Sequence, residues 1–444
     1  MDQNEITILQ TASRDAIANS LSRIQSTSNW LDIKRNRYSR RIEKIGTPSF
    51  DQGRINKPDL IEYISSSIFI HYQDSWGFFG QAMQAYLQGR QHAALHLAYY
   101  SELRSAMALL ASEGVGIFNY KHYGVDINGN CAILNSKGTH TALWEIFEEW
   151  AKMDKARELL LKIIKPASYS LEEWCTELGL IHIVRNSVAY DLLLSWGLDL
   201  RNMHSDKEAR NFASYRPSSF VLPKQKPFKN ILEYLISIWK FFEPKATSYY
   251  HNVDFQILHR SLMLSMPEIR SHSINTKNYS SSEKLKIINT ADQFGRTELE
   301  KSKLKEFLLN TDDKSHFFIL DKAAGTLNVH QPGGIDEVFA RTFLLLKLCS
   351  GSLKETIKRA NLSKEHLSFW LTDFHENFGI CSPSSDIQNY SDLWADYSPI
   401  LEDTHDWLMN NPTSNTRHRF MTQKPDIFLQ LCKTEAVALW ELGL

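Results

Sequence analysis

The stretch from residue 79 to residue 113 constrains the fold more than any other part of this chain. Its second half, AALHLAYYSELRSAMALLASEG, is rich in alanine and leucine and ends at Gly114. Both residue types favour helices, and glycine is the commonest residue just past a helix end. The segment therefore predicts long helical structure, interrupted near Gly89. Small side chains along it let neighbouring helices approach closely; they are Ala98, Ser101, Ser105 and Ala108.

Further helices are indicated along the whole chain. Apolar residues recur at helical spacing in the first 24 residues. A capping box at residues 170–173 begins a helix that we expect to carry Arg185. Another, short helix is expected to begin at Ser205 or Asp206 and to end before Pro217. Apolar or charged helical patterns also cover residues 228–243, 296–309, 338–349, 352–360 and 363–378.

Strand signals are few. Residues 117–120 and 131–134 flank the turn-rich sequence VDINGN, and residues 317–320 and 326–329 flank Gly325. Each pair predicts a small hairpin. The expected fold class is therefore mainly α: a helical bundle with minor β-hairpins and a smaller helical C-terminal region.

Changes in composition divide the chain into regions. Glycine and proline punctuate it near residues 46–53, and residues 271–286 are rich in serine, asparagine and lysine. We therefore expect an N-terminal helical and basic region (1–57), a central helical domain (58–270), a linker (271–286) and a C-terminal α-rich domain (287–444).

The overall charge argues against a dedicated duplex-DNA-binding protein. The 444 residues include 50 basic and 51 acidic side chains, for a formal net charge of −1. Binding to duplex DNA depends on neutralising phosphates and usually requires an excess of basic residues. The densest basic cluster, KRNRYSRRIEK at residues 34–44, is either a solvated surface or a local contact with nucleic acid.

The cysteines and the N-terminus point to the cytoplasm. Five cysteines are scattered without a CxxC pair, so neither a disulfide framework nor a zinc site is indicated. The polar start, MDQNEITILQ, has no signal-peptide pattern, and no uncharged apolar run is long enough to span a membrane. We expect reduced cysteines, a cytoplasmic location and no membrane association.

Motifs for common cofactors are missing from the sequence. There is no phosphate-binding GxxxxGK loop, no GxGxxG after a strand, no HExxH and no GxSxG. His92 and His96 stand four residues apart, a spacing that can bind a metal, but no third ligand recurs on the same helix face. We therefore expect neither a metal nor a cofactor.

An Arg-Asn pair followed by tyrosine occurs twice within a short stretch. The copies are Arg185-Asn186 with Tyr190 and Arg210-Asn211 with Tyr215. On a helix, an arginine and a ring four or five residues later share nearly one face. The repetition suggests a polar site among packed helices.

The helix around residues 96–104 carries a matching polar patch. His96, Tyr99, Tyr100, Glu102 and Arg104 interrupt an otherwise apolar stretch. Buried polar groups require partners. We therefore expect this helix to contact the segment bearing Arg185 or the one bearing Arg210.

In these features the chain resembles the HEPN domains over about residues 80–240. HEPN domains are helical bundles that often act as metal-independent ribonucleases. Their signature is an arginine, usually followed by asparagine, with a histidine shortly after it on a late helix that packs against an alanine-rich early helix. In this chain Tyr190 and Tyr215 stand where the histidine is expected. Tyrosine is a poorer base at neutral pH than histidine.

The resemblance implies an RNA-cleaving site or a catalytically silent relative of one. Arg210 or Arg185 would hold the scissile phosphate, because guanidinium matches phosphate oxygens. Asn211 or Asn186 would orient the arginine or the ribose. The proton would be moved by Tyr215 or Tyr190, or by a histidine supplied from His96 or His204. Further contacts to nucleic acid would come from Arg104, Arg201 and Arg216.

Two functions remain open at this stage. One is a ribonuclease or silent relative, which the resemblance places in a prokaryotic toxin or antiviral defence system, with RNA as a partner. The other is a non-enzymatic scaffold or adaptor in a multi-protein complex, since abundant aromatic residues and near-zero net charge suit protein partners. A protein partner or a homodimer is expected in either case.

Overall fold

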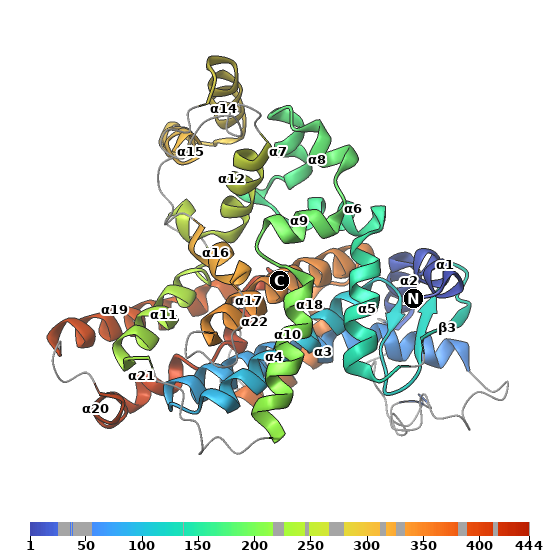
Figure 1. Ribbon diagram of the computed structural model, residues 1–444, viewed down its shortest axis with the longest axis horizontal. Coiled ribbons are helices and arrows are strands. Elements are labelled where there is room, and N and C mark those ends of the chain that lie inside the picture. Colours follow the sequence, from blue (N-terminus) through green and yellow to red (C-terminus); the bar gives the residue numbers. More distant parts are fainter. Residues whose placement is uncertain are drawn as a thin grey trace.

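The computed structural model describes residues 1–24, 36, 38, 56–135, 137–215, 226–244, 248–265, 279–310, 317–325, 334–380, 389–411 and 416–443 (Figure 1). These residues form many helices and one small antiparallel sheet, which confirms the mainly α fold class. None of the described helices combines the length and the apolar composition needed to cross a membrane. The basic cluster at residues 34–44 lies outside the described residues, apart from Asn36 and Tyr38.

Two long helices, α3 (Lys57–Leu87) and α4 (Gln91–Ser112), form the centre of the molecule. The side chain of Asn56 caps α3 by accepting a hydrogen bond from the amide of Asp59. The predicted interruption near Gly89 is confirmed, because the chain turns there at φ +80°, a conformation that glycine adopts without strain. The two helices pack against each other along their length. Helices from later parts of the chain also pack on α4.

A third long helix, α17 (Ile335–Arg359), packs against α4 and α3. The sequence predicts separate helices over residues 338–349 and 352–360, but these form one uninterrupted helix. Gly351 lies inside it, and a Cβ atom there would lie 2.9 Å from Ile163 at the end of α6 (Asp154–Ile163). The glycine therefore permits a close helix crossing and does not end the helix.

The N-terminal helices and the sheet cover one end of this core. Helices α1 (Gln3–Thr11) and α2 (Arg14–Ile24) confirm the predicted helical pattern. The strands are β1 (Val115–Gly116), β2 (His122–Val125) and β3 (Cys131–Asn135), in the antiparallel order β1-β2-β3. The prediction for 131–134 is confirmed and that for 117–120 is wrong. The carboxylate of Asp126 accepts the amides of Asn128 and Asn130, so the hairpin turn begins directly after residue 125.

The second predicted strand pair is wrong where the structure describes it. Residues 318–324 form helix α16 (Phe318–Ala324), and residues 326–329 lie outside the described part of the chain. The guanidinium of Arg341 donates hydrogen bonds to the carbonyls of Ala323 and Gly325, which satisfies the C-terminal end of α16. This stabilising contact comes from α17, so the sequence around residues 318–324 alone does not predict it.

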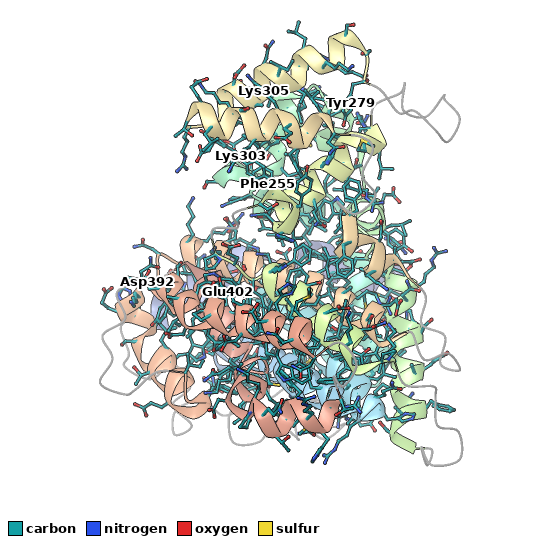
Figure 2. The ribbon with its side chains drawn as sticks, turned by 90° about the vertical axis from the view of Figure 1, so that its left-hand side faces the viewer. Phe255, Tyr279, Lys303, Lys305, Asp392 and Glu402 are labelled. Carbon is teal, nitrogen blue, oxygen red and sulfur yellow. The ribbon has the colours of Figure 1, made fainter. Side chains whose placement is uncertain are left out.

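Several helices project from the core, at the top of Figure 1 and in side view in Figure 2. Residues 281–286, predicted as the end of a linker, form the first turns of α14, because Ser280 and Glu283 make a capping box. Stacked rings of Tyr169 and Phe294 hold α14 to the segment before α7. The helices are α7 (Leu171–Glu177), α8 (Ile181–Asn186), α9 (Ala189–Ser195), α12 (Val253–Ser265), α14 (Ser281–Phe294) and α15 (Glu298–Leu309).

The remaining helices complete a core that continues across the predicted boundary between the central and C-terminal regions. Helix α22 packs on both α3 and α17. Short 3-10 turns cover Pro166–Ser168, Tyr249–His251 and Tyr390–Leu393. The helices not yet named are α5 (Thr139–Ala151), α10 (Leu200–Tyr215), α11 (Phe228–Lys240), α18 (Lys364–Phe378), α19 (Trp394–Asn410), α20 (Arg417–Gln423), α21 (Pro425–Gln430) and α22 (Glu435–Leu442).

Candidate functional site

Helix α10, which carries the second Arg-Asn copy, packs against α4 and α5. The predicted start at Ser205 or Asp206 is wrong, since the helix begins at Leu200. The carboxylate of Asp199 accepts the amide of Arg201, and this side-chain cap allows the helix to start a turn and a half earlier. Residues 200–215 consequently place Arg210 in the middle of the contact with α4.

Arg210 is the centre of a hydrogen-bonded network between three helices. Its guanidinium donates to the hydroxyl of Tyr100 on α4 (2.7 Å), to Oδ1 of Asn211 (2.7 Å) and to Nε2 of His140 on α5 (3.1 Å). It also lies over the ring of Tyr99, with the guanidinium carbon 5.7 Å from the ring centre. These contacts confirm the expected packing of the polar patch on α4 against the Arg210 segment.

The positive charge of Arg210 is buried without a negative partner. Only 8% of the residue is exposed, and its three hydrogen-bond acceptors are all neutral groups. Within the described part of the chain, no carboxylate lies within ion-pair distance of it, and its Nε atom makes no hydrogen bond. A buried, uncompensated charge is costly. The network therefore has the electrostatic character of a site that accepts an anion.

The hydrogen bonds of His140 fix its tautomer. Because Arg210 can only donate, Nε2 of His140 must accept, and Nδ1 then donates its proton to the hydroxyl of Tyr99, 3.0 Å away. Burial, followed by the charge of Arg210, lowers the pKa of His140 to about 4. At neutral pH the imidazole is therefore uncharged, and its lone pair faces the guanidinium.

The ring of His96 packs against that of Tyr100, with the two ring centres 4.8 Å apart. Its Nδ1 lies 2.7 Å from the hydroxyl of Ser214, which itself donates to the carbonyl of Arg210. Because the hydroxyl proton of Ser214 is donated to that carbonyl, Nδ1 of His96 must donate its own proton to the serine oxygen. The lone pair of the imidazole is then on Nε2. Burial, and then Arg210, lowers the pKa of His96. Two neutral histidines therefore belong to the network, His140 in contact with Arg210 and His96 in contact with Tyr100 and Ser214.

The lowered pKa of His140 predicts a pH-dependent stability. Between its folded pKa of about 4 and its ordinary value of 6.5, the folded protein binds fewer protons than the unfolded chain. The free energy of unfolding therefore falls as the pH falls through this window. We expect His140→Gln to reduce this dependence, measured by urea denaturation at several pH values from about 7 to about 4. Identical pH profiles for wild type and variant would contradict the assignment.

The first Arg-Asn copy does not form an equivalent site. Helix α8 ends at Asn186 and α9 begins at Ala189, so Arg185 and Tyr190 lie on different helices. The prediction that they share one helix face is therefore wrong. The helix capped at residue 170 is α7, which ends at Glu177 and does not carry Arg185. The side chains of Arg185 and Asn186 are exposed. Gly179, at φ +76°, ends α7 and separates it from α8.

The other predicted residues lie apart from Arg210 or outside the description. Arg104 contacts Nδ1 of His71 at 2.8 Å and pairs with Asp74, while Arg201 pairs with Asp199. Among the described residues, neither arginine is hydrogen-bonded to the Arg210 network. Arg216 and the side chain of Tyr215 lie outside the described residues, and no hydrogen bond is seen for His204 among those described.

Sequence reasoning missed His140. It lies near the start of α5, beside the aromatic residues of that helix, and nothing in its local sequence links it to Arg210. It reaches Arg210 only through the packing of α5 against α10.

A second buried cluster, formed by Asp206 and Arg341, connects α10 to α17. Asp206, one turn before Arg210, accepts two hydrogen bonds from Arg341, at 2.8 and 2.7 Å, and both side chains are fully buried. Burial, and then the charge of Asp206, raises the pKa of the neighbouring Glu102 well above its ordinary value. A bidentate arginine–carboxylate pair of this kind fixes the position of α10, and with it that of Arg210.

Comparison with protein-family models, with curated proteins and with solved structures found no match for this chain. The resemblance to HEPN domains accordingly depends on the residues and helices described above.

Proposed function

We propose that this protein is a HEPN-like, metal-independent endoribonuclease whose histidines come from α4 and α5. The observation that carries the proposal is the buried guanidinium of Arg210, which has no carboxylate partner in the described residues. It is hydrogen-bonded to neutral His140 and lies over the ring of Tyr100, which also contacts His96. Tyr215 occupies the position of the histidine expected on α10, and His140 or His96 supplies the missing group from another helix.

The proposed chemistry needs one anion-binding group and two proton-transfer groups. Arg210 binds a non-bridging oxygen of the phosphodiester, and Asn211 holds the guanidinium in place. His96, whose Nε2 carries a lone pair, takes the proton from the ribose 2′-hydroxyl as its oxygen bonds to phosphorus, giving a 2′,3′-cyclic phosphate. The P–O5′ bond breaks, and the leaving oxygen receives a proton from the other histidine after that residue has been protonated. The charge of the bound phosphate raises the pKa of both histidines towards a range that suits this exchange.

The test is incubation of the full chain with total RNA and with tRNA, with and without a chelator. We expect cleavage that the chelator does not inhibit, and products that end in a 2′,3′-cyclic phosphate. Cleavage that disappears with chelator would contradict the metal-independent mechanism.

Single replacements of the histidines distinguish catalysis from binding. His140→Gln and His96→Gln are each expected to lower the rate of RNA cleavage by about 10²- to 10⁴-fold, since each removes a proton-transfer group. The Kd for a non-cleavable RNA, with 2′-deoxyribose at the scissile position, should change little. A loss of affinity equal to the loss of rate would give the histidines a binding role only.

The second candidate is a scaffold or adaptor, or a silent HEPN relative that binds without cleaving. It is favoured by the fact that Arg210 already has hydrogen-bond partners on Tyr100, Asn211 and His140. In this case the wild-type chain does not cleave RNA, and a stable protein partner or dimer is expected instead. The toxin or antiviral setting and the cytoplasmic location belong to the same proposal and rest on the resemblance and on composition.

A further inference from the structure

A cavity of about 740 Å³ lies between the projecting helices and α17, away from the Arg210 network. Its walls come from α12, α14, α15, the segment around residue 167 and the C-terminal half of α17. Figure 2 shows the projecting helices in side view, with Phe255 on α12 and with Lys303 and Lys305 on α15. The volume falls in the range of small-molecule sites, and no residue bonded to Arg210 lines it.

One face of α17 supplies a row of basic side chains to this cavity. Lys347, Gly351, Lys354 and Lys358 follow at helical spacing, and all of them line it. Like charges at this spacing repel each other. Lys354 is reached by solvent within the cavity but is surrounded by protein on most sides, and this burial lowers its pKa. The row therefore concentrates positive charge on one wall of the cavity.

The acidic side chains of the cavity are already engaged. Glu441 accepts two hydrogen bonds from Lys347, and Glu355 pairs with Lys162 and Arg359. The carboxylate of Glu300 accepts the amides of Arg296 and Thr297. The remaining acids are Asp254, which accepts the amide of Lys165, and Glu243, which also has a partner.

Four basic side chains that line the cavity differ from these acids in having no polar partner among the described residues. In the described part of the chain, no side-chain hydrogen bond or ion pair is made by Lys165, Arg296, Lys354 or Lys358, although all of them line the cavity. Glu441 and Glu355 are neutralised by ion pairs, whereas Asp254 and Glu300 accept backbone amides and keep their charge. The four unpaired cations outnumber these two carboxylates, which favours a ligand carrying negative charge.

Aromatic rings and a strained turn complete the wall. Tyr249, Phe255 and Phe294 line the cavity. Phe255 and Phe294 are buried and pack on other rings, so the half-buried ring of Tyr249 is the one against which a planar group can stack. Ala167 and Ser168 line the cavity with φ values of +52° and +74°, in the left-handed region that residues with side chains rarely adopt. Consecutive strained residues of this kind concentrate at ligand-binding sites.

We propose that this cavity is a second ligand site and that it binds a phosphorylated nucleotide. The unpaired cations of α17, of the turn before residue 167 and of the loop before α15 contact the phosphates, and the aromatic wall contacts the base. This site goes beyond RNA cleavage and does not depend on it.

The test is isothermal titration of the full chain with ATP, adenosine and inorganic triphosphate. We expect ATP to bind, and Lys354→Ala and Lys358→Ala each to weaken it by about tenfold or more. Lys303→Ala is the matched control, because it removes an exposed lysine of the same projection that does not line the cavity; it should leave the Kd unchanged.

Three outcomes would overturn the proposal. The first is the absence of ATP binding to the wild-type chain at concentrations up to about 1 mM. The second is equal binding of inorganic triphosphate and ATP, which would remove the role of the base. The third is equal weakening by Lys303→Ala and Lys354→Ala, which would indicate general charge attraction. Circular dichroism of each variant shows that it is folded, so a loss of binding is assigned to the cavity.

Discussion

Replacement of Arg210 with alanine is expected to lower the rate of RNA cleavage by at least about 100-fold, with little change in stability. The rate falls because the only buried cation of the network no longer stabilises the charge on the phosphate, and removal of one such donor typically costs two to three orders of magnitude. Stability changes little because the loss of three hydrogen bonds is offset by the removal of a buried charge without a counter-ion. Cleavage kinetics and urea denaturation measure the two effects on the same preparations.

Arg359→Ala is a suitable control for this variant. Arg359 is a half-exposed arginine on α17 that pairs with Asp15 and Glu355, and its removal takes away the same charge elsewhere on the molecule. We expect unchanged cleavage and a stability loss within about 1 kcal/mol. If Arg210→Ala retains full cleavage, the proposed site is wrong. If the wild-type chain cleaves no RNA and Arg210→Ala lowers the free energy of unfolding by about 1–3 kcal/mol, the network has a structural role.

Replacement of Asp206 with alanine is expected to have the largest effect on folding, a decrease in the free energy of unfolding of about 3–5 kcal/mol. The variant leaves the guanidinium of Arg341 fully buried and without its carboxylate partner. It also loosens the attachment of α10 to α17, so we expect cleavage to fall as well. Chemical denaturation of the purified variant gives the magnitude.

Two further variants distinguish the effect of breaking the buried Asp206–Arg341 pair from the effect of losing one charge. Asp199→Ala removes an ion pair with the exposed Arg201 together with the cap of the same helix, and should cost about 1 kcal/mol. The double variant Asp206→Leu with Arg341→Met replaces both buried charges with apolar groups and should recover most of the stability. A similar loss for Asp199→Ala and Asp206→Ala would contradict the importance of burial.

Local sequence signals predicted the helices well where one face is apolar and the ends carry caps. The interruption at Gly89 followed from glycine chemistry, and the helices of the first 24 residues followed from apolar spacing. Gly351 shows where this reasoning fails, because the same residue type can end a helix or admit a neighbouring one. Only the position of Ile163 decides between the two. The helical state of residues 318–324 likewise depends on hydrogen bonds from Arg341, which is distant in sequence.

The candidate site was predictable in part. The polar patch on α4 pointed to a polar partner, and the Arg-Asn repeat limited that partner to two segments. Sequence could not choose between them, because the choice depends on where helices begin and end. A break at Ser187 and Val188 separates Arg185 from Tyr190, whereas Asp199 extends α10 and places Arg210 against Tyr100. His140 was missed because it reaches the site through tertiary packing alone.

The position of α22 against α3 has a consequence for the order of events during synthesis. The hydroxyl of Tyr72 donates to the carbonyl of Ala438, 366 positions later, and Thr434 donates to the carbonyl of Trp76. Because a chain leaves the ribosome from its N-terminus, the face of α3 that contacts α22 stays uncovered until residues 434–442 have been made. Contacts this distant in sequence slow folding and expose apolar surface in the meantime. The nascent protein is therefore expected to depend on chaperones until α22 docks.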